Sequence, residues 1–382
     1  MTSYRKRIAA IAAALSLGAT AFLATPAEAK QDKEVPYGQT RHDTLRGEAP
    51  KDLLIGTAIA GGGHHLDMPY ENPFYAEPEY RKVLATQFSS VTPENQLKWE
   101  FVHPEQDVYN FQEADDIVAF AKANKQEVRG HALFWHSQNP EWLENGDFTA
   151  DELRAILKEH IYTVVGHYKG DLYQWDVTNE IFDGQGRLRM QENIWLRELG
   201  PGIIADAFRW AHEADPTAKL FLNDYGVEGI NAKSTAYYEL AKQLLADGVP
   251  LHGFSAQAHW DMRWGMPQDI EANFQRFDDL GLETAITELD VRFTLPPSGI
   301  PTQDQLERQS KYYTDTLQAC LNVLGCKSFT VWGFNDTYSW VPVFFEGTGA
   351  ATIMFEDYTA KPAYYDMLAM LKDATPGKSP RR

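Results

Sequence analysis

Two glutamates have the residue type and the setting that acid–base chemistry requires. Glu180 and Glu288 each close a short run of the kind that forms a strand, and polar residues surround both. One such glutamate alone is as often an ion-pair partner as a catalyst. Glycoside hydrolysis requires two carboxyl groups, because one protonates the leaving oxygen while the other attacks the anomeric carbon or activates water. The pair therefore favours a glycosidase, provided that the fold brings these distant positions together.

The rest of the sequence predicts a fold that can do this. Short β-branched and aromatic runs recur, and each is followed by a longer stretch with the apolar spacing of a helix. The eight expected strands are residues 53–60, 88–94, 128–135, 172–180, 219–225, 253–260, 284–291 and 328–335. The clearest helices between them are residues 151–168, 231–247 and 303–323. Eight strand-then-helix units predict an α/β protein whose parallel sheet closes into a single (β/α)8 TIM barrel.

Polar and aromatic residues gather at the carboxyl ends of nearly all these strands. They are Glu94 and Asn95, His131 with Trp135 and His136, Asn179 and Glu180, Asn223 to Tyr225, Gln257 with His259 and Trp260, Glu288 with Asp290, and Trp332. In a barrel these ends converge on one face, where active sites lie. The clustering therefore supports both the barrel and a site on that face.

Aromatic and imidazole side chains leave alternatives open. Tryptophans near strand ends could stack on sugar rings, although packing in the barrel is expected for at least one of Trp99, Trp135, Trp260, Trp332 and Trp340. Histidines invite a metal site, but no spacing such as H-E-x-x-H occurs among them, and neutral hydrogen-bonding roles explain His64, His65, His131, His136 and His259. We expect neither metal nor cofactor. A serine nucleophile is disfavoured because no G-x-S-x-G motif is present.

The ends of the chain differ from its middle. Basic residues 5–7, an apolar stretch over 8–24 and the small-x-small pattern at 27–29 predict a signal peptide at residues 1–29 rather than a membrane anchor. We expect a polar extension at 30–50, the barrel as the catalytic domain at 51–373, and a flexible tail at 374–382. The mature protein is then secreted and extracellular.

Charge and cysteine content restrict the partners. A formal net charge of −19 makes nucleic acid and anionic membranes poor partners, whereas a neutral polymer is compatible with it. We expect a glycan substrate and a monomeric protein. The chain has two cysteines, and export to an oxidising compartment favours a disulfide between Cys320 and Cys326 over a metal site.

From about residue 53 to 371 the chain resembles glycoside hydrolase family 10, the retaining xylanases. The motifs that carry the resemblance follow in family order: ENQLKW at 94–99, RGHALFWHSQ at 129–138, WDVTNE at 175–180, LNDY at 222–225, QAH at 257–259, TELD at 287–290 and TVWG at 330–333. The resemblance implies a secreted endo-1,4-β-xylanase that hydrolyses internal bonds of xylan by double displacement through a covalent glycosyl-enzyme.

The resemblance also implies a role for each matched residue. Glu180 would be the acid/base and Glu288 the nucleophile. The sugars on the non-reducing side of the cut would be held by Glu94, Asn95 and Lys98, and walled by Trp332 and Trp340. Around the reacting ring would lie His131, Trp135, Asn179, Gln257 and His259, and Tyr225 would reach toward the reducing side. The Cys320–Cys326 pair matches a disulfide of many members.

Four places depart from the family pattern and put substrate choice in doubt. They are Gln96, Val341 after Trp340, the aromatic and glycine-rich stretch 343–351, and the GGGHH stretch 61–65. All are expected in loops over the cleft, so they affect chain-length preference and aglycone choice. Two alternatives stay open: a family member acting on another β-glycoside, such as a tomatinase acting on steroidal glycoalkaloids, and a barrel that binds glycans without cleaving them.

Overall fold

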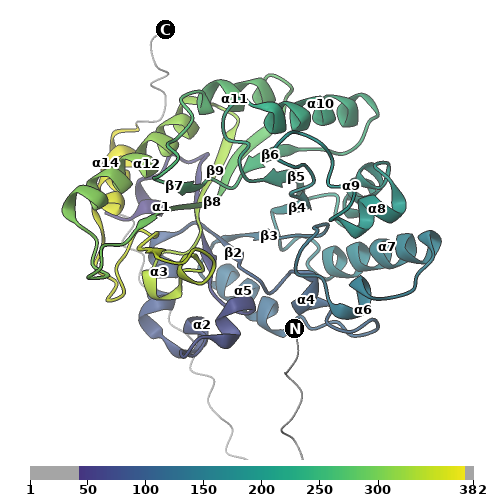
Figure 1. Ribbon diagram of the computed structural model, residues 1–382, viewed down its shortest axis with the longest axis horizontal. Coiled ribbons are helices and arrows are strands. Elements are labelled where there is room, and N and C mark those ends of the chain that lie inside the picture. The colour runs from purple at the N-terminus through teal and green to yellow at the C-terminus, as the bar shows by residue number, and fades with distance from the viewer. Residues whose placement is uncertain (1–42, 375–382) are drawn as a thin grey trace, which may run out of the picture. The chain divides into compact units, whose positions relative to one another are not determined.

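The computed structural model describes residues 43–374, and the expected signal peptide and most of both terminal extensions lie outside this range. Eight parallel strands form a closed barrel with helices around it (Figure 1). The barrel strands are β1 (Leu54–Ile59), β2 (Ser90–Pro93), β3 (Glu127–Gly130), β4 (Gln174–Asn179), β5 (Lys219–Asp224), β6 (Gly253–Ala256), β8 (Glu283–Thr294) and β9 (Cys326–Val331). Because β9 pairs with both β8 and β1, the sheet closes. The predicted TIM barrel is confirmed.

Strand boundaries depart from the prediction where the chain turns into the carboxyl-end face. The third strand ends at Gly130, and the residues after it keep only separate contacts with β4, such as the Leu133 N–H donation to Asp176 O at 3.1 Å. The sixth expected strand, 253–260, is interrupted at Ala258, whose φ is 63°. Two short strands lie outside the eight of the barrel, β7 (His259–Asp261) and β10 (Thr348–Gly349). Both pair with the carboxyl-terminal part of β8, residues 290–294.

The predicted helices are confirmed to within one residue at each end, and their first turns explain why they begin there. Capping boxes at Thr149, Asn231 and Thr302 start α7 (Ala150–His167), α10 (Ala232–Ala246) and α12 (Gln303–Asn322). The remaining helices are α1 (Leu45–Glu48), α2 (Pro73–Ala76), α3 (Pro78–Gln87), α4 (Trp99–Val102), α5 (Gln112–Ala123), α6 (Glu141–Glu144), α8 (Ile194–Leu199), α9 (Ile203–Ala214), α11 (Ile270–Asp278), α13 (Val341–Phe344) and α14 (Pro362–Asp373), with 3-10 turns η1 (Gly63–Asp67) and η2 (Asp336–Tyr338). Within residues 43–374, no helix has the length and apolar character needed to cross a membrane.

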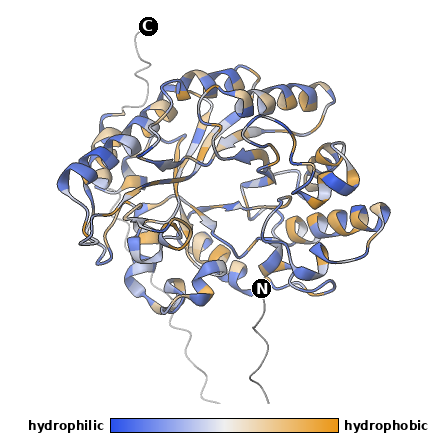
Figure 2. Cartoon of the chain, in the orientation of Figure 1, coloured by the Kyte–Doolittle hydropathy of each residue, from blue (hydrophilic) through white to orange (hydrophobic). Residues whose placement is uncertain are grey.

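Each outer helix buries one side against the barrel. In α9 the residues Ile204, Ala207, Phe208 and Ala211 recur at intervals of three and four and are buried. Figure 2 shows hydrophobic and hydrophilic stretches alternating along the outer helices, as this one-sided burial requires. The helices thus fix the strands whose ends carry the candidate site.

Part of the stretch 30–50, which the sequence predicts as a flexible extension, is folded. Leu45 of α1 is buried in the core, and Arg46 donates from Nη1 to Ala85 O at 2.8 Å. Thr44 caps the helix by accepting from Gly47 N–H at 3.1 Å. The polar composition of residues 30–50 does not predict that α1 packs on the barrel, because Leu45 is the one buried residue of that helix.

The expected disulfide is present between Cys320, near the end of α12, and Cys326, at the start of β9. Closing so short a loop contributes about 2 kcal/mol in the chain-entropy treatment. The bond therefore fixes one helix-to-strand turn, while the barrel core holds the fold.

Candidate active site

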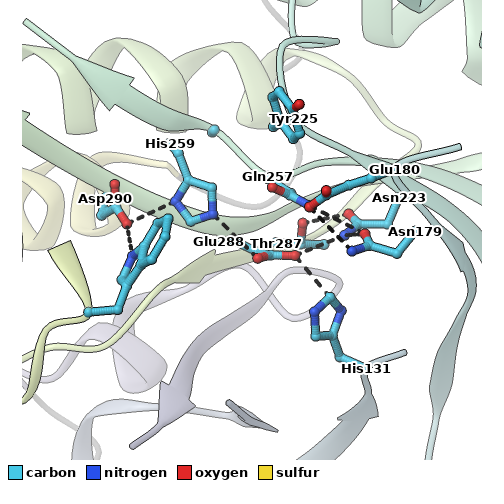
Figure 3. A network of polar contacts seen from close by, with 12 residues as sticks. His131, Asn179, Glu180, Asn223, Tyr225, Gln257, His259, Thr287, Glu288 and Asp290 are labelled. Atoms are coloured by element: carbon cyan, nitrogen blue, oxygen red, sulfur yellow. Dashed lines mark hydrogen bonds and ion pairs between the residues drawn. The ribbon is translucent and has the colours of Figure 1, made fainter. Parts of the chain in front are cut away.

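The carboxyl ends of the barrel strands bring most of the predicted site residues into one polar network (Figure 3). The residues come from six strands or the turns after them: His131, Asn179 with Glu180, Asn223, Gln257, His259 and Glu288. All are buried except Glu180 and His259, which are partly exposed. The network is therefore fixed by the barrel itself and does not depend on a mobile loop.

Glu288 is held by donors on several sides and is only 4% exposed. Its Oε1 accepts from Asn223 Nδ2 at 2.8 Å and from Arg129 Nη2 at 3.3 Å, and its Oε2 lies 3.4 Å from His259 Nε2. Burial alone would raise the pKa of this carboxyl group, but His131, His259 and Arg129 together lower it well below its usual range. Glu288 is therefore ionised at neutral pH.

A buried ion pair supports this charge. Arg129 of β3 donates from Nη2 to Asp176 Oδ2 at 2.5 Å, and His131 Nδ1 lies 2.8 Å from the same oxygen. Burial would lower the pKa of Arg129, but Asp176 and Glu288 raise it. A buried charge is tolerated only when it is paired and hydrogen-bonded, and here one guanidinium serves two carboxylates.

His259 lies between two carboxylates. Its Nδ1 is 2.8 Å from Asp290 Oδ2, which also accepts from Trp340 Nε1 at 2.8 Å, while its Nε2 faces Glu288. Burial alone would lower the pKa of His259, but Asp290 and then Glu288 raise it to about 10. Both ring nitrogens therefore carry protons at neutral pH, and the imidazolium donates to both acids.

Glu180 has a different environment. Its φ of 56° is uncommon for a residue with a side chain, and the N–H donation to Asn223 O at 3.0 Å helps to hold it. Its Oε1 accepts from Gln257 Nε2 at 3.0 Å and from Asn179 Nδ2 at 3.4 Å. His136 Nε2 lies 3.9 Å from Oε2, and burial lowers the pKa of that histidine, which is then neutral at pH 7. Within residues 43–374, no lysine or arginine forms an ion pair with Glu180.

Three amide side chains connect the two glutamates. Asn223 Nδ2 donates to Glu288 Oε1 and also to Asn179 Oδ1, at 2.8 and 2.9 Å. Gln257 Nε2 donates to the same Asn179 oxygen at 3.3 Å and to Glu180 Oε1 at 3.0 Å. The positions of the two carboxyl groups are therefore fixed relative to each other.

A second polar group follows β2 and contains the residues predicted to hold the non-reducing side. Glu94 Oε2 lies 2.7 Å from His65 Nε2, and Lys98 Nζ donates to Asn95 Oδ1 at 3.0 Å. Burial raises the pKa of Glu94, but His65, His64 and Lys98 together lower it, and the net shift is downward. Lys98 also lies 5.0 Å from the centre of the Trp135 ring. The structure therefore brings Glu94, Asn95 and Lys98, the three residues predicted to hold this side, together after β2, with Trp135 of the reacting ring beside them.

Tyr225 lies on the loop after β5, and Figure 3 shows its ring apart from the buried network. Its hydroxyl accepts from Arg189 Nη2 at 2.7 Å, and Lys233 Nζ lies 3.7 Å from the ring centre. Lys233 Nζ also donates to Asp224 Oδ1 at 2.6 Å. Burial raises the pKa of this aspartate to about 7. The ring is 41% exposed and so is available to a ligand.

The tryptophans divide into two groups. Trp332 and Trp340 both contact His259, with ring centroids 6.4 and 4.9 Å away. Trp99 and Trp260 pack elsewhere: the Trp99 ring stacks on His160 at 3.5 Å, and Trp260 Nε1 donates to Thr316 Oγ1 at 3.1 Å. The packing alternative therefore holds for Trp99 and Trp260.

Sequence reasoning gives no role to Arg129, Asp176 or Asn223. A signal exists for the first two, because charged residues inside buried strands are rare unless they are paired. The amide of Asn223 has no comparable signal, since its position at a strand end does not reveal that it contacts both Asn179 and Glu288.

Two clusters place possible metal ligands within 4.8 Å of one another, namely His64, His65 and Glu94, and His131, Asp176 and Glu288. In the second cluster the guanidinium of Arg129 already pairs with both acids and would repel a cation. In the first, His65 and Glu94 already bond to each other. The contacts fit the hydrogen-bonding roles expected of these histidines.

Comparisons with known proteins agree with this geometry. Residues 53–370 match the sequence model described as Glycosyl hydrolase family 10. The chain belongs to this family. It is 40% identical over 312 residues to endo-1,4-beta-xylanase B of Thermotoga neapolitana, covering 81% of this chain and 89% of that protein. It is also 40% identical over 301 residues to endo-1,4-beta-xylanase A of Humicola insolens, covering 78% of each.

Solved structures of family 10 members have the same fold. Xylanase 10B of Thermotoga petrophila RKU-1, solved in complex with xylobiose, superposes with a TM-score of 0.79 at 40% identity, covering 86% of this chain and 97% of that one. Native xylanase 10B of Thermotoga maritima gives the same TM-score at 40% identity, with 86% and 98% covered. The resemblance predicted from the motifs is confirmed.

Replacing Asp290 with asparagine tests the charge arrangement of this family 10 site. The pKa of His259 is about 10 in the folded protein, so its protonated form stabilises the fold in full below about pH 6.5, the ordinary histidine pKa, and this contribution is lost as the pH rises toward 10. In Asp290→Asn the pKa of His259 is expected to fall, as measured by NMR titration of the imidazole. An unchanged His259 pKa in the variant would contradict the assignment.

Proposed function

We propose that this family 10 enzyme is a retaining endo-1,4-β-xylanase, with Glu288 as nucleophile and Glu180 as acid/base. The observation that carries the proposal is the contrast between the two glutamates. Glu288 is surrounded by protonated donors that hold it ionised, whereas Glu180 contacts neutral groups and is linked to Glu288 through amides. Relatives named as endo-1,4-beta-xylanases at about 40% identity support the substrate class.

In the first step an oxygen of Glu288 attacks the anomeric carbon of the bound sugar. The bond from that carbon to the glycosidic oxygen breaks, and the proton of Glu180 passes to the leaving oxygen. The product is a covalent glycosyl-enzyme, and Glu180 becomes a carboxylate. Asn179, held by Asn223 and Gln257, is placed to donate to the sugar 2-hydroxyl, a contact that strengthens in the transition state.

In the second step Glu180 accepts a proton from water, and the water oxygen attacks the anomeric carbon. The ester to Glu288 breaks, both glutamates return to their starting forms, and the configuration at the anomeric carbon is retained. His259 stays protonated throughout and stabilises the departing carboxylate of Glu288. Retaining enzymes need a separation of about 5 to 5.5 Å between the carboxyl groups, which we expect here.

Sugars on the non-reducing side would be bound by Glu94, Asn95 and Lys98, with Trp332 and Trp340 as walls, and Tyr225 would contact the reducing side. Asn95 and Lys98 already bond to each other, so their donors are oriented before a ligand arrives.

Initial rates on xylan and on a steroidal glycoalkaloid test the choice of substrate. Faster turnover of the glycoalkaloid would overturn the xylanase assignment and favour the tomatinase alternative.

We also infer that the protein is exported and acts as a monomer outside the cell. The leader pattern in residues 1–29 and the disulfide support export. Amino-terminal sequencing of protein from the culture medium tests this, with Lys30 expected as the first residue.

Glu288→Gln is expected to abolish turnover on every glycoside, because the amide oxygen is too weak a nucleophile to form the ester. The matched control is Glu283→Gln on the same strand, where Glu283 only pairs with Lys219 Nζ at 3.1 Å near the barrel surface. Initial rates on xylan should be near wild type in the control. Turnover by Glu288→Gln at more than about a hundredth of the wild-type rate would exclude Glu288 as nucleophile.

Glu180→Ala is expected to lose activity on xylan but to keep part of its activity on aryl xylosides with good leaving groups, because these need little protonation. Steady-state rates on xylan and on a nitrophenyl xylobioside give the comparison. An unchanged rate on xylan would remove Glu180 from the acid/base role.

A further inference from the structure

Two segments that depart from the family pattern lie against each other. Residues 61–65 lead into η1, and α13 begins the loop that contains residues 343–351. The rings of His64 and Phe344 make an edge-to-face contact, with centroids 5.8 Å apart and an interplanar angle of 81°. The loop after the first barrel strand therefore touches the loop after the last.

This contact lies between groups predicted to bind the non-reducing side. On one flank the ring of His64 lies 3.8 Å from that of His65 at a tilt of 40°, and His65 bonds to Glu94 at 2.7 Å. On the other flank Phe344 contacts Trp340, with centroids 5.2 Å apart. Phe344 thus continues the aromatic wall from Trp340 toward Glu94.

The loop that carries Phe344 is fixed by its own contacts. Phe345 packs under the guanidinium of Arg292 at 3.8 Å from its ring centre, and Gly347 O accepts from Leu295 N–H at 3.0 Å. Beyond them, β10 pairs with β8. Phe345 is therefore used for packing, while its neighbour Phe344 remains 59% exposed.

Exposure alone would not assign a role to Phe344. Single exposed apolar residues are normal on protein surfaces, and Leu324 is exposed to a greater degree. Phe344 differs because it is held on a fixed loop between Trp340 and His64. An exposed ring in that place has the chemistry to pack on the apolar face of a pyranose.

Glu94, Asn95 and Lys98 are buried, whereas Phe344 is exposed. We infer that Phe344 stacks on a sugar farther out than those held by the three buried residues, so that it extends the non-reducing side of the cleft. The inference rests on the proposed function. Burial lowers the pKa of His64 to about 4, so the neighbouring imidazole is neutral at pH 7 and is compatible with an uncharged sugar.

Two nitrophenyl substrates that differ only in length on the non-reducing side test this role. We would measure kcat/KM for nitrophenol release from the β-xylobioside and from the β-xylotetraoside, because the leaving group and the chemical step are then the same. The ratio of tetraoside to bioside is expected to fall about three- to tenfold in Phe344→Ala, the range of one aromatic contact. Phe344→Trp should keep a ratio near wild type.

Val343→Ala is the matched control, because Val343 is an exposed neighbour on the same helix. It should keep the wild-type ratio. A Phe344→Ala ratio equal to wild type, or an equal fall in Val343→Ala, would overturn the stacking role while leaving the proposed function intact. A wild-type enzyme that releases nitrophenol from neither substrate would contradict the proposed function and this inference with it.

Discussion

The structure depends on keeping one buried carboxylate ionised. Glu288 is removed from water, and burial alone would protonate it, so the protein must supply positive charge and donors in its place. Arg129, His259 and Asn223 do this. The two cations, Arg129 and His259, each need a partner of their own, since a buried cation without a counter-charge would be as costly as the anion. Asp176 and Asp290 are those partners, which is why the site is a network of acids and bases and not a simple pair of glutamates.

A closed parallel barrel suits this requirement. Its strand ends converge, so β3, β4, β5, β7 and β8 each contribute a side chain to the network, and the backbone donors and acceptors inside the strands are already used. Strain is confined to the turns, as at Glu180 and Ala258, where positive φ values aim side chains that a regular strand would direct elsewhere. Substrate preference can then vary in the loops, such as the one that carries Phe344, without disturbing the charges beneath.

Much of this could be predicted from the sequence, because strand-forming runs and strand-end polar residues are local signals. Eight strands, three long helices and the grouping of Glu180, Gln257 and Glu288 follow from them. Pairings between distant strands are not local, so the sequence can signal that Arg129 and Asp176 are paired inside the barrel but not that they pair with each other and with Glu288. The same holds for the docking of Leu45 and for the contact of His64 with Phe344. Trp99 is one of the tryptophans for which packing stayed open, since an aromatic residue near a strand end does not reveal which way its ring points.

Proton NMR of xylohexaose during the first minutes of hydrolysis tests the central claim most directly, that an ionised Glu288 attacks the anomeric carbon while Glu180 serves as the acid/base. The account predicts that the new reducing ends appear first as the β-anomer and convert to the α-anomer only by mutarotation. Initial appearance of the α-anomer would contradict it, because water and not Glu288 would then attack the sugar.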